Sequence, residues 1–243
     1  MINEIAAWIK KQVQAAGAQG CVFGLSGGLD SSVVGILCKR AFPEGVLGLL
    51  MPCFSHEEDL KDAQELAEKF SIPTKFIDLK PACSQLYVQL EGKTYDGKEM
   101  NLAIANLKPR LRMITLYYHA NKLNYLVTGT GNKSEAVMGY FTKYGDGGVD
   151  LLPLGGLLKT QVKEMAKELE IPTKIIDKKP SAGLWHGQTD EEEMGITYAV
   201  LDKIILGLEK KKLTGLDQKL VDKVRQKMAQ TEHKRRVPPF FIP

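Results

Sequence analysis

Long hydrophobic runs are missing from this chain of 243 residues. The longest apolar stretch, residues 46–51, has the length of a strand, whereas a membrane-spanning helix needs about 20 apolar residues. The N-terminus also lacks the order of basic, apolar and small residues that marks a secretory signal. We therefore expect a cytoplasmic protein that makes no contact with a membrane.

Cysteine is scarce too, with four residues in the whole chain. They are widely spread and none forms a C-x-x-C pair, which excludes a miniprotein held together by disulfides. Without a secretory signal, we expect free thiols at Cys21, Cys38, Cys53 and Cys83. A cysteine nucleophile is an alternative, but no surrounding motif supports it.

Charge of one sign is in small excess, because 33 Lys and Arg residues stand against 29 Asp and Glu residues. With 44% hydrophobic and 26% charged residues, the composition is globular rather than disordered or collagen-like. The positive excess lies in residues 202–236, which fit either a nucleic-acid patch or a solvated helix face beside an anionic ligand. Aromatic residues do not alternate with these charges, so we favour the second interpretation and expect no nucleic-acid partner.

Hydrophobic periodicity predicts strands that alternate with helices. This alternation is typical of an α/β fold with a mostly parallel sheet and helices on both faces. No repeat or change of composition marks a boundary, so we expect a single domain over residues 1–243. The expected strands are 21–25, 46–51, 75–79 and 125–128; the helices are 2–16, 33–38, 57–70, 101–120, 160–169, 195–208 and 217–228; long loops are 140–158 and 178–193; and 237–241 is an extended tail.

A segment rich in glycine and serine, Ser26-Gly27-Gly28-Leu29-Asp30-Ser31, joins the first strand to the next helix. Glycine lets a backbone approach an anion closely, and the helix adds unpaired N–H donors and the positive end of its dipole. The segment therefore predicts a phosphate-binding loop, although it lacks the lysine of a Walker A loop and the spacing of a dinucleotide-binding loop. Because Asp30 would repel phosphates directly, we also expect Mg²⁺ between them.

The pattern S-G-G-x-D-S after a strand resembles the pyrophosphate loop of the N-type ATP pyrophosphatases. Later blocks narrow the resemblance to the ammonia-dependent NAD synthetases. It implies a Rossmann-like fold of the adenine nucleotide alpha hydrolase-like kind. The blocks follow the order of that family and are TGTGNKSE (128–135), FTKYGDGGVDLLPL (141–154), KTQV (159–162), KPSAGLW (179–185), GQTDE (187–191) and HKR (233–235).

The resemblance implies an AMP-forming ligase of the last step of NAD biosynthesis. In this family the carboxylate of nicotinate adenine dinucleotide (deamido-NAD) attacks the α-phosphorus of ATP. Ammonia then captures the acyl-adenylate, which gives NAD, AMP and pyrophosphate. Adenylation is needed because a free carboxylate has only oxide as its leaving group. Glutamine-using relatives carry an additional amidohydrolase domain that has no room before residue 24, so we expect free ammonia as the nitrogen donor.

The resemblance also implies roles for single residues. Asp30 and Glu135 would be the Mg²⁺ ligands, although Glu135 by itself fits a first-turn residue favoured by a helix dipole. Lys159 would contact an ATP phosphate, and Asp30, Glu135, Lys159 and Asp150 are the expected catalytic residues. Family members often have threonine where Ser181 stands. The expected contacts to ATP are Gly24, Leu25, Ser26, Gly27, Gly28, Leu29, Asp30, Ser31, Thr130, Lys159 and Ser181.

An anionic dinucleotide suits basic contacts. The positions that resemble contacts to deamido-NAD are Arg110, Lys143, Asp150, His233 and Lys234. Arg112 is an alternative to Arg110, and Asp146 or Asp150 is expected to take a proton from ammonium. In the family, helices comparable to residues 101–120 form a tight homodimer. The spacing of the apolar residues in this segment fits core packing equally well; they are Leu102, Leu107, Leu111, Ile114, Tyr117 and Tyr118.

Three other interpretations stay open at this level. Another adenylating enzyme is the nearest, but a tRNA-modifying ligase needs an RNA-binding extension and a GMP synthetase a different C-terminal dimerisation domain. A nucleotide sensor would bind ATP without turnover, and the presence of Asp30, Glu135 and Lys159 weighs against it. A basic protein that binds nucleic acid would show steeply salt-dependent binding.

Overall fold

Four parallel strands form the centre of the computed structural model, which describes residues 1–97, 101–185 and 187–242. They lie in the order β3-β2-β1-β4, and every pairing is parallel, which confirms the expected sheet. The chain places β2 and β3 on one side of β1 and then returns to add β4 on the other side. The strands are β1 (Gly20–Gly24), β2 (Val46–Leu50), β3 (Thr74–Phe76) and β4 (Tyr125–Val127).

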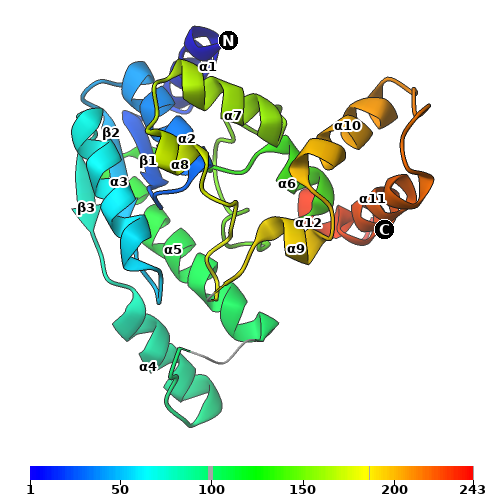
Figure 1. The fold of residues 1–243 in the computed structure, drawn as a ribbon. Helices are drawn as coiled ribbons and strands as arrows, with labels where there is room; N and C mark the ends of the chain where they lie inside the picture. Colours follow the sequence, from blue (N-terminus) through cyan, green and yellow to red (C-terminus); the bar gives the residue numbers. More distant parts are fainter. Residues whose placement is uncertain (98–100, 186, 243) are drawn as a thin grey trace.

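Helices cover both faces of this sheet (Figure 1). Alternate residues of a strand point to opposite faces, and the two apolar cores follow that alternation. Cys21 and Phe23 of β1 pack with one group of helices, whereas Val22 packs on the other face. The first group comprises α1 (Ile2–Ala15), α2 (Leu29–Ala41), α3 (Glu57–Lys69), α7 (Lys159–Glu168) and α8 (Thr173–Ile176); α4 (Lys80–Glu91) and α5 (Leu102–Leu123) lie on the other face.

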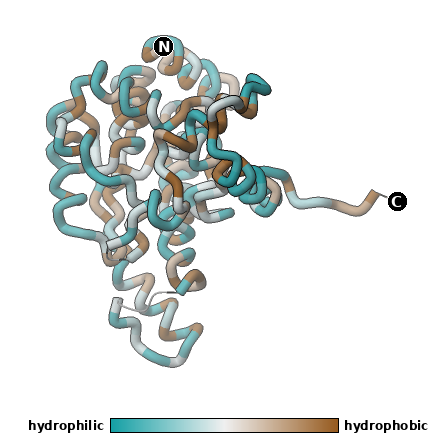
Figure 2. Tube along the Cα trace, turned by 45° about the vertical axis from the view of Figure 1, so that its right-hand side comes forward, coloured by the Kyte–Doolittle hydropathy of each residue, from teal (hydrophilic) through white to brown (hydrophobic). Residues whose placement is uncertain are grey.

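A smaller group of helices packs beside the sheet layers, with its own apolar core (Figure 1). Leu201, Ile204 and Val221 are fully buried in this core. After the last helix the chain runs outward as a tail, in which Phe241 is 88% exposed (Figure 2). The helices are α6 (Lys133–Met138), α9 (Asp190–Met194), α10 (Tyr198–Glu209), α11 (Gln218–Gln230) and α12 (Glu232–Arg235).

Several element ends differ from the sequence-based expectation. The expected strand 75–79 ends at Phe76, because Asp78 accepts a hydrogen bond from the Lys80 N–H at 2.8 Å where α4 begins. The helix expected over 101–120 continues to Leu123, and Asn124 ends it with a φ of 53° in the left-handed region. The helices α4, α8, α9 and α12 were not predicted from the sequence, whereas α6 has Glu135 in its first turn, which was the alternative given for that residue.

Two expectations about the whole chain can be compared with the structure. All four cysteines are buried free thiols. Among the described residues, no helix is long and apolar enough to cross a membrane.

Candidate active site

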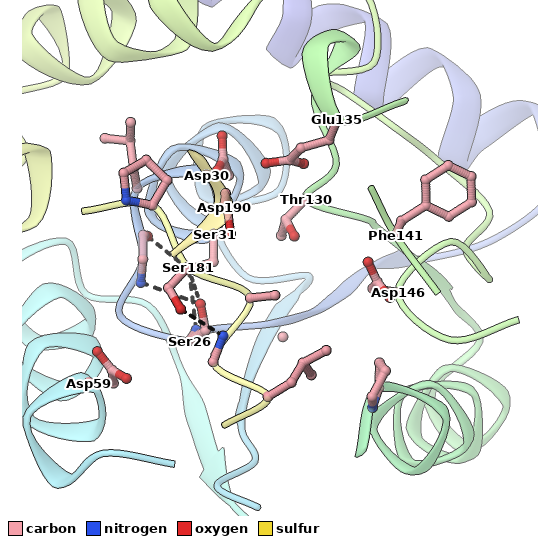
Figure 3. A pocket seen from close by; sticks show the side chains of 18 of the residues that line it. Ser26, Asp30, Ser31, Asp59, Thr130, Glu135, Phe141, Asp146, Ser181 and Asp190 are labelled. Atoms are coloured by element: carbon pink, nitrogen blue, oxygen red, sulfur yellow. Dashed lines mark hydrogen bonds between the residues drawn. The ribbon is translucent and has the colours of Figure 1, made fainter. Parts of the chain in front are cut away.

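A cavity of about 960 Å³ opens at the carboxyl ends of β1 and β4. Ligands of open α/β sheets bind at this edge, where the strand order reverses. It is lined by the phosphate-binding loop after β1, by residues 128–130 after β4, by one face of α5, and by residues from the loops 140–149, 178–185 and 187–190. Figure 3 shows Asp30, Glu135, Thr130 and Ser181 directed into the same space. Its volume is in the range of small-molecule sites.

The phosphate-binding loop is held open by its own serines. The Ser26 and Ser31 hydroxyls lie 3.0 Å apart, and the Ser26 N–H donates to Ser31 Oγ at 3.2 Å (Figure 3). Ser32 Oγ donates to Gly28 O at 2.8 Å, where α2 begins. The first N–H groups of α2 have no partner within the helix and point to the cavity end of the loop, so an anion can accept from them.

Lys159 lies between two carboxylates in the cavity wall. It donates to Asp30 Oδ2, and Lys159 Nζ is 3.4 Å from Glu135 Oε1. The side chains of Lys159, Asp30 and Glu135 are 9%, 16% and 17% exposed. Burial raises the pKa of Glu135 to about 8; Lys159 opposes that rise and Asp30 adds to it. Burial alone would lower the pKa of Lys159, but the two carboxylates raise it, so the lysine stays charged.

The fully buried Asn132 brings Asp30 and Glu135 together. Its amide donates to Asp30 Oδ1 at 3.3 Å, and its side-chain oxygen accepts from the Glu135 N–H at 3.1 Å. Glu135 Oε2 in turn accepts from the Asn132 N–H. Two converging carboxylates fit Mg²⁺, which proteins bind with one or two carboxylates plus phosphate oxygens and water. Among the described residues, no cluster of three or more metal-ligating side chains was found.

The loop that leads to Ser181 is anchored at both sides. Lys178 contacts Asp59 at 2.9 Å and also donates to Asp62 on α3. Lys108, 1% exposed on α5, donates to Leu184 O. Ser181 itself is exposed, lines the cavity, and accepts from the Gly183 N–H at 3.1 Å. The expected long loop 178–193 ends in α9, and residue 186 within it lies outside the described residues.

Most of the other residues expected to contact ATP line the cavity. Thr130 and Lys159 line the cavity. So do seven of the eight loop residues, namely Gly24, Leu25, Ser26, Gly28, Leu29, Asp30 and Ser31. Gly27 contributes no lining atom, because its φ of 77° turns it toward the Asp59 backbone.

Three of the residues expected to bind deamido-NAD, Arg110, Lys143 and His233, form a chain of contacts beside the cavity. Arg110 is 3.5 Å from Lys143 O, and Lys143 donates to His233 O at 2.6 Å. Lys234 donates to Phe141 O at 2.8 Å and lines the cavity, whereas Arg110, Lys143 and His233 do not.

Asp150 also lies off the cavity, and both of its carboxylate oxygens are engaged. Its Oδ1 accepts from Tyr117 at 2.9 Å and its Oδ2 from the Val127 N–H at 2.8 Å. Asp146, in contrast, lines the cavity, and burial raises the pKa of its carboxyl. Of the two aspartates, Asp146 is the one that lines the cavity, and its Oδ1 accepts from the Thr142 N–H at 2.9 Å.

Two residues that line the cavity, Arg112 and Asp190, were given little weight in the sequence analysis. Arg112 donates to Met51 O at 3.1 Å and to Ser55 at 3.2 Å. Asp190, 4% exposed, accepts from Tyr198 at 3.0 Å, and its Oδ1 has no hydrogen-bond partner among the described residues. Burial raises the pKa of Asp190, which Lys159 partly offsets. Asp190 belongs to the GQTDE block, so the sequence pattern could have identified it as a candidate site residue.

Comparison with known proteins identifies the family. A family model for NAD synthase matches residues 1–238. An NH3-dependent NAD⁺ synthetase of Carboxydothermus hydrogenoformans is 49% identical over 236 residues, 97% of this chain and 94% of that protein. An NMN synthetase structure from Francisella tularensis has a TM-score of 0.89 and 36% identity, with 98% and 96% of the two chains covered. An NH3-dependent NAD synthetase structure from Campylobacter jejuni has a TM-score of 0.83 and 30% sequence identity, with 99% of this chain and 97% of that chain covered. The chain belongs to the NAD synthase family.

Proposed function

We propose that this chain amidates deamido-NAD with ammonia at the expense of ATP, releasing NAD, AMP and pyrophosphate. The observation that supports this most is the cavity wall, where the phosphate-binding loop faces Lys159 and the carboxylates Asp30 and Glu135. The family membership supports the same reaction. Residues 1–243 would act as one unit, since α10 packs on α6 and α7.

In the first step, the formation of the acyl-adenylate, different residues of the cavity have different roles. The N–H groups at the start of α2 and the serine hydroxyls of the loop would bind the phosphates, and Lys159 adds a positive charge beside them. Asp30 and Glu135 would hold Mg²⁺, which when bound neutralises charge on the phosphates. These groups stabilise the charge that develops as the substrate carboxylate displaces pyrophosphate.

The second step needs a dry cavity and a neutral amine. Ammonia attacks the acyl carbon of the adenylate and AMP leaves. Asp146 would accept the proton that ammonium must lose. The loops 140–149, 178–185 and 187–190, which contribute residues to the cavity lining, would keep water from the adenylate.

The exposed face of α5 supports a homodimer. Arg110, Ile114 and Tyr118 are four residues apart in turn, so they share one face of the helix. Ile114 is 59% and Tyr118 62% exposed, which corrects the alternative that all apolar residues of this segment pack in the core of one chain. A second copy on this face would bring Arg110 into the interface. The four free cysteines fit a cytoplasmic location, where thiols stay reduced.

A mononucleotide acceptor is the second candidate. The Francisella tularensis structure that superposes with a TM-score of 0.89 is named an NMN synthetase. Curated relatives at 41% to 49% identity, including the Carboxydothermus hydrogenoformans protein, are named NAD⁺ synthetases, which favours the dinucleotide.

One assay tests these assignments. The purified protein is incubated with ATP, Mg²⁺ and ammonium, and with either deamido-NAD or nicotinate mononucleotide. We expect NAD and AMP in equal amounts with deamido-NAD, abolished by Asp30→Asn, and a raised KM for ammonium in Asp146→Asn. Turnover of the mononucleotide alone would replace the dinucleotide assignment. ATP binding without either product would favour the sensor.

A further inference from the structure

We propose that Asp202, a residue outside the cavity, is a positioning residue that holds Lys159 and Glu135 in the arrangement that binds ATP. Asp202 lies on α10 and is 3% exposed. It is not among the described residues that line the cavity. The inference rests on the proposed use of ATP and adds to it a residue that touches no substrate.

Two other helices cap the N-terminus of α7. Leu158, the N-cap residue, has no side-chain acceptor to offer. The Thr160 N–H donates to Asp202 Oδ2 at 2.9 Å, and the Lys159 N–H donates to Ser134 Oγ at 3.0 Å. The Ser134 hydroxyl donates in turn to Asp202 Oδ1. One carboxylate thus satisfies, directly or through Ser134, two N–H groups that have no partner within their own helix.

These contacts hold the backbone next to both charged groups of the site. Lys159 is the first residue of α7, and Glu135 directly follows Ser134 on α6. Because α10 packs against both helices, Asp202 links the two from a third element. A shift of α7 relative to α6 would separate Lys159 Nζ from Glu135 Oε1, which are 3.4 Å apart.

Asp202 stands beside apolar residues along α10, and its side chain accepts hydrogen bonds from the Thr160 N–H and the Ser134 hydroxyl. Its neighbours Leu201, Ile204 and Ile205 belong to the apolar core of the smaller helical group. Burying an ionised carboxylate is costly unless hydrogen bonds or positive charge compensate. Here the compensation comes from the donors at the start of α7 and from the positive end of that helix dipole. The carboxylate is therefore explained by the helix terminus that it caps.

The test compares binding of ATP in two backgrounds. Asp202→Asn keeps the side-chain size but removes the charge and one acceptor. Calorimetry with Mg²⁺ and ATP, without an acceptor substrate, avoids turnover. We expect the Kd to rise about tenfold, because small misplacements of a binding group have effects of at least this size. In a Lys159→Met background the same change should raise the Kd by no more than about threefold, because Lys159, one of the two groups that Asp202 positions, is gone.

The controls separate positioning from stability. Asp217→Asn makes the same change in the cap of α11, where Asp217 accepts from the Lys219 N–H at 2.8 Å away from the cavity, and should leave the Kd unchanged. If Asp202→Asn does not fold, Ser134→Ala is measured instead, with an expected rise of about threefold.

Two results would overturn the proposal: a folded Asp202→Asn variant with unchanged Kd, or an equal loss in both backgrounds. Absence of binding by the unsubstituted chain would refute the proposed function instead.

Discussion

Two buried carboxylates, Glu135 and Asp62, have pKa values that shift in opposite directions, and they differ in the number of lysines that they contact. Glu135 shares Lys159 with a second carboxylate, and burial raises its pKa to about 8. Asp62, whose side chain is 3% exposed, contacts two lysines, Lys174 at 2.8 Å and Lys178, which also contact the more exposed Glu65 and Asp59. Burial alone would raise the pKa of Asp62, but hydrogen bonds from the two lysines outweigh it, so that pKa lies below 3.8. Asp62 is therefore ionised at all pH values where the chain would work.

Replacing Asp62 should weaken the fold in a pH-dependent way. Because its folded pKa is lowered, its contribution to the free energy of unfolding is present above the unfolded pKa, about 3.9, and is lost as the pH falls through the folded pKa. Asp62→Asn should lower the free energy of unfolding by about 1–2 kcal/mol at pH 7. Urea unfolding from pH 7 downward measures the difference from the unsubstituted chain. It should shrink below about pH 4.

Glu65→Gln is the matched control for this prediction. Glu65 contacts the same Lys174 at 2.5 Å, but its side chain is 59% exposed. Exposed ion pairs contribute little, so this variant should unfold like the unsubstituted chain at every pH. A difference between Asp62→Asn and the unsubstituted chain that persists unchanged into acid would show that its cause is packing rather than charge.

At the scale of elements, the phosphate-binding loop depends on a close approach to α3. Gly27 has a φ of 77°, and a Cβ there would overlap the Asp59 backbone oxygen. Gly27→Ala should therefore push the loop away from α3. We expect a loss of about 1–3 kcal/mol in the free energy of unfolding and a KM for ATP raised about tenfold, measured by urea unfolding and initial rates.

Gly17→Ala is the control that separates backbone strain at a positive φ from displacement of the loop. Gly17 has a similar φ of 67° after α1, but a Cβ there meets nothing within 4 Å. This control should lose some stability, because a left-handed alanine is strained, and keep its KM for ATP. Equal KM values for the two variants would contradict the assigned role of the contact between Gly27 and Asp59.

Whether a helix or strand could be predicted from the sequence depended on its apolar pattern and on its length. The strands at 21–25 and 46–51 were predicted because a strand buried on both faces is a short apolar run, and the longer amphipathic helices because burial on one face gives an apolar stripe. The short helices α8 and α9, with four and five residues, leave no period to detect. The helix α4 has Pro81 in its first turn and two buried residues, Cys83 and Tyr87, so its apolar stripe is thin.

The candidate site likewise has residues that the sequence could predict and residues that it could not. The phosphate-binding loop, Glu135 and Lys159 belong to contiguous motifs, and the structure brings them to one cavity. Asp202 stands 43 residues after Lys159 in an ordinary amphipathic helix, and only the packing of α10 gives it a function. The position of Asp150 off the cavity depends on the Tyr117 contact across α5, which no spacing in the sequence indicates.

At the scale of the whole molecule, the helix α5 and the loop beside it carry several exposed apolar side chains. Leu102 is 71%, Ile114 59% and Tyr118 62% exposed on this helix, and Tyr144 in the neighbouring loop is 54% exposed. Arg110 lies on the same face as Ile114 and contacts the loop at Lys143. Covering this face with a second copy would remove apolar surface from water and enclose a residue expected to bind the dinucleotide.

Ile114→Glu should therefore dissociate the proposed dimer and weaken dinucleotide use together. A charge in the middle of an apolar interface should weaken association by about 30-fold or more, which light scattering coupled to gel filtration detects as a monomer. The KM for deamido-NAD should rise much more than the KM for ATP, since the ATP-binding cavity is built within one chain. Trp8→Glu, at a 40% exposed site on α1, is the control and should change neither. A monomeric variant with an unchanged KM for deamido-NAD would separate the dimer from the substrate site and place the whole dinucleotide site within one chain.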